Sequence, residues 1–406
     1  MTGWLFSRQL LPLLLILGCG CRWLPAQNLR DPEFTAQALE GLDLLHNLDH
    51  DLASEYFKEL KSQFPEHPAP PQYLAHTIWL RELFRRHELN LDRFTAPGSF
   101  DKPSVTAMAA SDRQLFFDNI AACQSLASKI LEEVPGHKDA RYFMGLSEGI
   151  LASFAFTIDR DKGRAFKHGK KAYRQHKDLV TEDRQYHDAY MSIGLYEYVV
   201  SNLPWYIKWL AAIMGYHGSE EQGLEYLSLA AEKGRYVSTD ASVLLMVLLV
   251  REERFEEALT IVTGLRQKHP RNYLLHLNRA RILEYMDETD QAVREYRRIV
   301  ELAESETLNY QKLSLSSFYY ELGGKLLKLS RHRQALLQFQ KAIAHSDTSD
   351  RQRALSHLKA GQIHDIEGEP TEAVAHYEQV LRLEEIANSH DIARKVLEKL
   401  ARKNDQ

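Results

Sequence analysis

The sequence has few of the residues that mark disulfide-rich, low-complexity or nucleic-acid-binding proteins. Its 406 residues include three cysteines, 20 glycines and 13 prolines, too few for a disulfide-dense scaffold or a mostly disordered chain. Lys and Arg number 51 against 56 Asp and Glu, so the net charge is −5. A general nucleic-acid binder needs a strong basic excess to displace counterions, and we therefore expect no nucleic-acid partner.

Recognisable catalytic and metal-binding motifs are also scarce. The sequence contains no GxxxxGK[ST], no GxGxxG after a strand and no HExxH. GLSEG at 145–149 matches GxSxG, but it lies in the long helix expected over 139–156 and not at a turn between a strand and a helix. His46 and His50 lie four residues apart, near Asp49 and Asp51, and could share a helix face suited to a metal. The sequence places no third ligand, so a solvated pair is the preferred interpretation. We expect a protein that is not an enzyme and that carries no cofactor or metal.

The N-terminus has the form of a secretory signal. Arg8 precedes the apolar run 10–17, which is too short to span a bilayer. The segment ILGC at 16–19 resembles a bacterial lipobox, in which an apolar and a small residue precede a cysteine. That resemblance implies a lipoprotein-type signal peptide over 1–18 and a diacylated Cys19 that anchors the chain to a membrane.

Two other interpretations of the cysteines remain open. Cys21 fits the lipobox pattern less well than Cys19, and both cysteines could be incidental to an ordinary secretory signal. Gly20, where an Asp would suggest retention at the inner membrane, implies the periplasmic face of the outer membrane. Cys123 lies in a helical apolar pattern and is expected in the core.

Most of the remaining chain repeats a pattern of 34 residues. The template W-x₂-L-G-x₂-Y…A-x₃-F…P fits the tandem units 239–272 and 273–306, whose Ala258 and Ala292 are one repeat apart. Small residues in the first helix and Ala in the second let two backbones approach, while a large residue four positions later fills the next groove. Three more units fit the template, at 316–349 with Gly323 and Phe339, at 354–387 with Gly361 and Tyr377, and at 34–67 with Gly41 and Phe57.

With these repeats, the chain resembles the tetratricopeptide (TPR) repeat lipoproteins of the bacterial outer membrane. The resemblance implies an all-α fold of TPR-type helical hairpins stacked as a right-handed superhelix, an α-solenoid. It also implies a concave TPR face that binds a protein or peptide partner. Repeat consensus positions are packing positions, so the motif predicts the fold without identifying the partner.

The repeats predict an organisation along the chain. Loop-like composition at 92–112 suggests that the N-terminal repeat is semi-independent, and in the central repeats Gly145 and Gly149 are the expected close-approach positions. After the signal peptide we expect an N-terminal TPR-like repeat (34–91), a linker loop (92–112), degenerate helical repeats (113–236), four C-terminal TPR repeats (239–387) and a C-terminal helix and tail (388–406).

Two segments could carry an interface. The insertion 195–216 holds only two charges in 22 residues, and its Trp205, Tyr206 and Trp209 suit a membrane interface or a hydrophobic partner. An extra helix buried against neighbouring repeats is the preferred alternative. The segment 160–177 has eight Lys or Arg and one acid, and could bind anionic lipid headgroups or an acidic partner, although a solvated helix face is the more common case. Its candidate interface residues are Lys167, Lys170, Lys171 and Arg174.

Together these features favour a lipid-anchored TPR scaffold or adaptor at the bacterial cell envelope. The alternative is a periplasmic component of a transport system, which binds a hydrophobic ligand or contacts a membrane transporter through the insertion 195–216. The sequence predicts neither the partner nor the oligomeric state.

Overall fold

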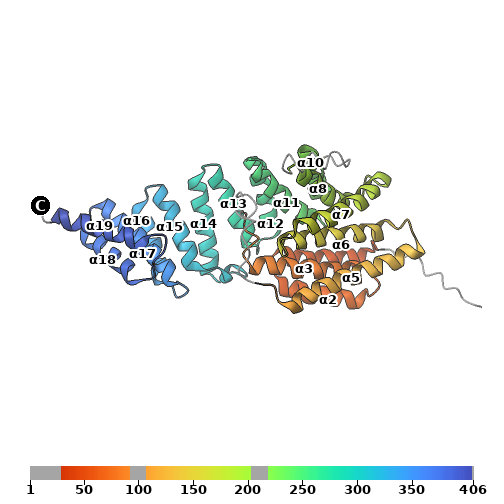
Figure 1. Cartoon of the computed structure of the whole chain (residues 1–406), viewed down its shortest axis with the longest axis horizontal. Helices are drawn as coiled ribbons and strands as arrows, with labels where there is room; N and C mark the ends of the chain where they lie inside the picture. The colour runs from red at the N-terminus through yellow and green to blue at the C-terminus, as the bar shows by residue number, and fades with distance from the viewer. Residues whose placement is uncertain (1–28, 92–106, 203–217, 405–406) are drawn as a thin grey trace, which may run out of the picture.

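The computed structural model describes residues 29–91, 107–202 and 218–404, and these residues contain helices and no β-strand (Figure 1). The predicted all-α solenoid is confirmed, because successive helices pair and the pairs stack along the molecule. The pairs are α1 (Pro32–His46) with α2 (His50–Gln63), α3 (Ala69–Arg85) with α5 (Ala110–Glu133), α6 (Lys138–Thr157) with α7 (Lys162–Glu182), and α8 (Tyr190–Ser201) with α10 (Glu220–Lys233).

The second half of the chain continues the same arrangement. Short 3₁₀ turns, η2 (His187–Ala189) and η3 (Tyr310–Lys312), precede α8 and α15. The later pairs are α11 (Ser238–Arg251) with α12 (Phe255–Lys268), α13 (Tyr273–Tyr285) with α14 (Thr289–Glu304), α15 (Leu315–Lys328) with α16 (His332–Ala344), and α17 (Asp350–Glu367) with α18 (Pro370–Arg382), followed by α19 (Ser389–Asn404).

Close approach of the paired helices rests on the glycines that the repeat pattern predicts. A Cβ added to Gly41 in α1 would lie 2.4 Å from the ring of Phe57 in α2, and one added to Gly323 would lie 2.8 Å from Phe339. Atoms do not approach so closely, so a side chain at either position would push the two helices apart. The large residue of the second helix thus packs directly on the glycine of the first.

The two glycines of α6 differ from each other. A Cβ on Gly145 would lie 2.3 Å from Nε2 of the buried His176, whereas one on Gly149 would meet no atom closer than 3.7 Å. The expectation of close approach is therefore confirmed for Gly145 and wrong for Gly149.

The N-terminal pairs share their core with the central ones. One cluster of buried side chains runs from Leu29 and Phe34 through Tyr73 and Tyr142 to Tyr236. The N-terminal region is therefore not semi-independent, because its apolar residues are buried against later repeats. The predicted linker loop 92–112 lies between α3 and α5, which pack on each other as one pair. Its residues 92–106 lie outside the described residues, and the prediction is wrong for its last three residues, which begin α5.

Three further observations concern the predicted elements. The insertion begins within α8, which continues to Ser201, and its remainder from 203 lies outside the described residues. In the described part of the chain, no helix combines the length and hydrophobicity needed to cross a membrane. The helices α15 to α19 extend away from α2 and α3 at the opposite end of the molecule (Figure 1).

Candidate functional site

The helix α1 lies across the starts of several later helix pairs. Just before α1, Arg30 Nε donates to Asp139 Oδ1 at the start of α6 over 2.7 Å. Thr35 Oγ1 lies 3.1 Å from the Tyr236 hydroxyl, which precedes α11. The contacts thus connect α1 to residues 109 and 201 positions further along the chain.

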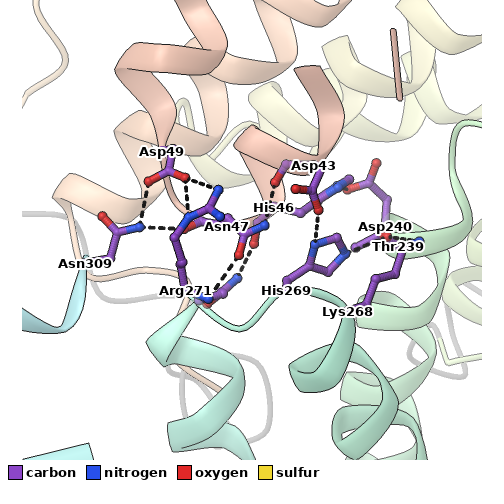
Figure 2. A network of polar contacts seen from close by, with 11 residues as sticks. Asp43, His46, Asn47, Asp49, Thr239, Asp240, Lys268, His269, Arg271 and Asn309 are labelled. Atoms are coloured by element: carbon purple, nitrogen blue, oxygen red, sulfur yellow. Dashed lines mark hydrogen bonds and ion pairs between the residues drawn. The ribbon is translucent and has the colours of Figure 1, made fainter. Parts of the chain in front are cut away.

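A network of polar contacts continues from the end of α1 to α11 and α12 (Figure 2). His46 Nε2 lies 3.0 Å from Asp240 Oδ1, and His269 Nδ1 lies 2.9 Å from Asp43 Oδ1. The other nitrogen of His269 lies 3.1 Å from the hydroxyl of Thr239. Because the imidazole bridges Asp43 and Thr239, it connects the first helix of the chain with the α11–α12 pair.

The same network extends to α13 and η3 through Asp49. Arg271 donates from Nη2 and Nε to Asp49 Oδ2 over 2.6 and 2.9 Å, and Asn309 Nδ2 donates to Oδ1 over 2.8 Å. Asn47 accepts two more hydrogen bonds, one on its side-chain Oδ1 from the amide of Arg271 and one on its carbonyl oxygen from Asn309 Nδ2. Only 4% of the Asp49 side chain is exposed, so these donors replace its lost hydration.

The helix α3 makes a second row of contacts with the same helix pairs. Tyr73 packs on Tyr236 with ring centroids 6.3 Å apart, and Phe84 packs on Tyr273 at 6.1 Å. His76 Nε2 lies 3.8 Å from Asp240 Oδ1, on the carboxylate that His46 also approaches. The starts of α11 and α13 are therefore covered by α3 as well as by α1.

These contacts locate α1 and α3 on the inner side of the curved array. A helix of 15 residues is about 22 Å long at 1.5 Å per residue. Helices pack about 8–10 Å apart, so the four pairs from α6 to α14 in a straight row would extend well beyond it. Contacts of Arg30 and α1 with the first, third and fourth of these pairs require the row to curve towards α1. The starts of α6, α11 and α13 on this side of the array thus contact the chain's own N-terminal segment.

Electrostatics in this network depend on burial. Burial would raise the pKa of Asp240, but the imidazoles of His76 and His46 outweigh it and hold the pKa at about 2. Burial and the neighbouring His46 lower the pKa of His269 to about 4. The site therefore favours an ionised Asp240 and a neutral His269 at neutral pH.

The prediction that His46 and His50 form a solvated pair is wrong. His46 contacts Asp240, while His50 is buried and packs on Phe84 with ring centroids 5.1 Å apart. Desolvation lowers the pKa of His50 to about 4. Among the described residues, no three or more His, Cys, Asp or Glu side chains are grouped so that they could hold a metal ion.

Beyond the reach of α1 and α3, a charged cluster joins the first helices of two successive pairs. In α15, Lys325 Nζ lies 2.7 Å from Glu284 Oε2 of α13 and 3.8 Å from Glu321 Oε2. Arg281 of α13 approaches both carboxylates, at 3.6 and 3.9 Å. Between 11% and 42% of each side chain is exposed, so the cluster is accessible to a partner. The repeat pattern does not predict this cluster, because its consensus positions depend on packing and not on surface charge.

The candidate cations all lie on α7. Lys167, Lys171 and Arg174 are exposed, and Lys170 is half-buried. Lys171 Nζ donates to Glu148 Oε1 over 3.1 Å, so Lys171 is ion-paired with α6.

The remaining candidate residues are Cys19, Trp205, Tyr206 and Trp209. All four lie outside the described residues. The expectation that Cys123 is a core residue is confirmed, because its thiol is fully buried and its pKa is raised by desolvation to about 12.

Comparisons with solved structures return helical-repeat proteins. Yeast Tom70 is 12% identical, with 93% of this chain and 90% of that chain covered and a TM-score of 0.34. Human IFIT1, in a dimer with m7Gppp-AAAA, is 15% identical, with coverages of 92% and 87% and a TM-score of 0.38. The C-terminal part of a TPR repeat-containing protein from Cytophaga hutchinsonii is 12% identical, with coverages of 87% and 98% and a TM-score of 0.31.

No curated protein matches the sequence. A family model does match, over residues 167–395, which is more than half of the 406 residues. The matched region runs from the middle of α7 into α19 and so contains the charged cluster of α13 and α15. The chain belongs to the Iml2/Tetratricopeptide repeat protein 39 family.

Proposed function

We propose that this protein is a scaffold that holds a protein or peptide partner on the inner face of its C-terminal helix pairs, from α13 to α18. The observation that carries the proposal is that α1 and α3 cover the starts of the central pairs, whereas the contacts described above reach no further than η3. The end of α13 and the pairs beyond η3 are the part of the array that these contacts do not cover. The resemblance to TPR scaffolds supports a protein partner, and the charged cluster of α13 and α15 supports a partner with polar or charged groups.

Photo-crosslinking tests where the partner lies. A photoreactive residue placed at 321 in α15 or at 362 in α17 is expected to form adducts with the partner in native membranes. The same residue at 340 on α16, the second helix of its pair, is the control and is expected to form none. Adducts at 340 with none at 321 and 362 would contradict the proposal.

Charge reversal gives an independent test. Glu321→Lys places a third cation beside Arg281 and Lys325, so a partner that depends on this cluster is expected to be lost. Gln340→Lys makes the exposed surface of α16 more positive without touching the cluster and is expected to retain the partner. Circular dichroism of both variants shows whether the helices are intact.

The location at the bacterial cell envelope is a separate proposal, supported by the sequence of residues 1–21 alone. A lipid on Cys19 would hold the scaffold on the periplasmic face of the outer membrane, since each buried CH₂ contributes about 0.8 kcal/mol. Cys19→Ala is expected to abolish incorporation of labelled palmitate and to release the protein from membranes. Label retained by Cys19→Ala would instead point to Cys21.

A further inference from the structure

The helix α7 differs in charge from the rest of the molecule. Its 21 residues contain seven Lys or Arg and two acids, a formal charge of +5 in a chain whose total is −5. The remaining residues therefore carry −10. A surface of one sign on a protein of the opposite sign attracts anions to one place.

The cations of α7 are divided between its first turn and its exposed face. In the first turn, Arg164 is paired with Asp159 and Asp161. Further along, Lys167, Lys171 and Arg174 follow the spacing of one helix face, and that face is exposed. Lys171 also contacts Glu148 of α6, and it remains half exposed in this pair.

Apolar side chains lie beside this face. Phe166 is 36% exposed, and its ring centroid lies 6.1 Å from that of Tyr196 in α8. One turn further along α8, Val199 is 44% exposed. Exposed cations flanked by exposed apolar groups are the combination found on proteins that bind the surface of an anionic membrane.

The start of the fold lies near the end of α7. Arg30 contacts Asp139 and stacks over Tyr186, while Lys138 and Arg141 pair with Asp183 and Glu182 where α7 ends. About ten residues separate Cys19 from this point, and they span at most about 35 Å. Since α7 is about 31 Å long, an anchor on Cys19 and the cationic face can reach one bilayer surface.

We propose that the exposed face of α7, formed by Lys167, Lys170, Lys171 and Arg174 with Phe166 beside it, docks on the anionic headgroups of a lipid bilayer. The face adds a site to the proposed scaffold and does not depend on its partner or on acylation of Cys19. It places the inner face of the C-terminal pairs at a defined position relative to the membrane.

Vesicle sedimentation tests the proposal. The full chain carrying Cys19→Ala, which removes the acylation site, is mixed with vesicles of phosphatidylcholine alone or with added phosphatidylglycerol. Binding is expected only to the vesicles with phosphatidylglycerol, and it is expected to weaken with added salt because the Debye length shortens. Equal binding to both kinds of vesicle, or binding to neither, would overturn the proposal.

Charge-neutralising variants locate the contact. The triple variant Lys167→Gln, Lys171→Gln, Arg174→Gln is expected to bind about 100-fold more weakly at low salt, since each cation near an anionic surface contributes about 1 kcal/mol. The triple variant Arg333→Gln, Arg382→Gln, Lys395→Gln removes the same charge from exposed positions of α16, α18 and α19 and is expected to bind normally.

Equal losses in the two triple variants would assign the effect to net charge and contradict docking through α7. Polyglutamate or polyuridylate serves as a competitor of different chemistry. If either binds through the same three residues while vesicles do not bind, the lipid assignment is wrong. Circular dichroism and the unfolding midpoint identify a variant that has lost its fold. In that case Phe166→Ser, which keeps all cations, provides a second measurement. It is expected to bind vesicles more weakly, and unchanged binding would count against insertion of the ring.

Discussion

At the scale of single residues, the packing of α6 against α7 depends on one glycine and one buried imidazole. The ring of His176 stacks on Tyr142 with centroids 5.2 Å apart, and its Nε2 lies 3.0 Å from the Tyr142 carbonyl oxygen. The ring is therefore fixed from two directions and cannot yield to a side chain at Gly145. Phe57, Phe339 and Tyr377 hold the matching place in other pairs, whereas the imidazole here also contacts a backbone carbonyl oxygen.

We expect Gly145→Ala to lower the free energy of unfolding by about 1–3 kcal/mol, the usual cost of overpacking a rigid core. Urea denaturation followed by circular dichroism measures the change. The control is Gly149→Ala on the same helix, where the new methyl group meets only ordinary contacts. It is expected to be neutral or to stabilise by up to about 1 kcal/mol, because Ala favours the helix. A larger loss for Gly149→Ala than for Gly145→Ala would contradict this account.

Buried histidines also predict how stability changes with pH. Desolvation lowers the pKa of His176 to about 4, and desolvation with the charge of His46 lowers that of His269 to about 4. An unfolded histidine has a pKa of about 6.5, so between these values the unfolded chain binds more protons. The stabilisation that comes from keeping these two histidines neutral in the folded protein is complete above about pH 6.5, and it is lost as the pH falls towards 4.

The urea midpoint is therefore expected to fall between about pH 7 and pH 5. His269→Gln, which can still hydrogen-bond Asp43 and Thr239, is expected to show a shallower fall. The charged groups around this ring are Asp43, Lys268 and His46. An identical pH dependence in wild type and His269→Gln would exclude His269 as a contributor.

At the scale of elements, α1 and α2 are held to the later pairs by a few polar contacts. The carboxylate of Asp49 accepts hydrogen bonds from Arg271 and Asn309, both more than 200 residues away in sequence. The guanidinium is one-third exposed, whereas the carboxylate is buried. Loss of the arginine would leave a buried charge with a single donor.

We expect Arg271→Ala to destabilise the docking of α1 and α2 by about 2 kcal/mol, less than a fully buried pair because Arg271 is partly hydrated. Hydrogen exchange is expected to accelerate in α1 and α2 and to remain unchanged in α16 to α18. Arg254→Ala is the control, since Arg254 pairs with the exposed Glu257 within one turn and contributes little. Equal acceleration in both variants would contradict the role of Asp49.

The sequence predicts the contacts within pairs much better than those between distant ones. Gly41 with Phe57 and Gly323 with Phe339 are close in the chain, and the 34-residue pattern specifies both. The sequence does not predict the α3–α5 pair, because a loop-like segment separates its two helices. No local pattern connects Asp49 with Arg271 or His269 with Asp43, so the contacts of the N-terminal helices with later pairs could not be predicted.

At the scale of the whole molecule, the two ends differ in how many neighbours each helix pair has. The core that begins at Leu29 extends to Ala241, and polar contacts connect the N-terminal helices with residues as far along the chain as Asn309. The last pair has its own small core, in which Tyr377 and Leu358 pack with Leu400 of α19. A pair that contacts only its sequence neighbours unfolds more readily than one held from a second side.

Native-state hydrogen exchange is therefore expected to show two levels of protection. Amides of α17 and α18 should exchange through an opening of lower free energy than those of α6 and α11. Low concentrations of urea should accelerate exchange in α17 and α18 first. The described residues of the C-terminal end would then unfold while α1 remains docked. A single opening free energy for all helices would show instead that the array unfolds as one unit.

Contacts between α1 and the later pairs also limit how the gene can change. Tandem arrays commonly gain or lose a repeat, since each copy needs only its neighbours. Here Arg30 and the helix α1 that follows it meet Asp139, Asp240 and His269 at fixed intervals, so a duplicated or deleted pair between α6 and η3 would leave some of these partners out of reach. Copy number is thus constrained in the first three-quarters of the chain, whereas extra repeats can be added beyond α16 without disturbing any of these contacts.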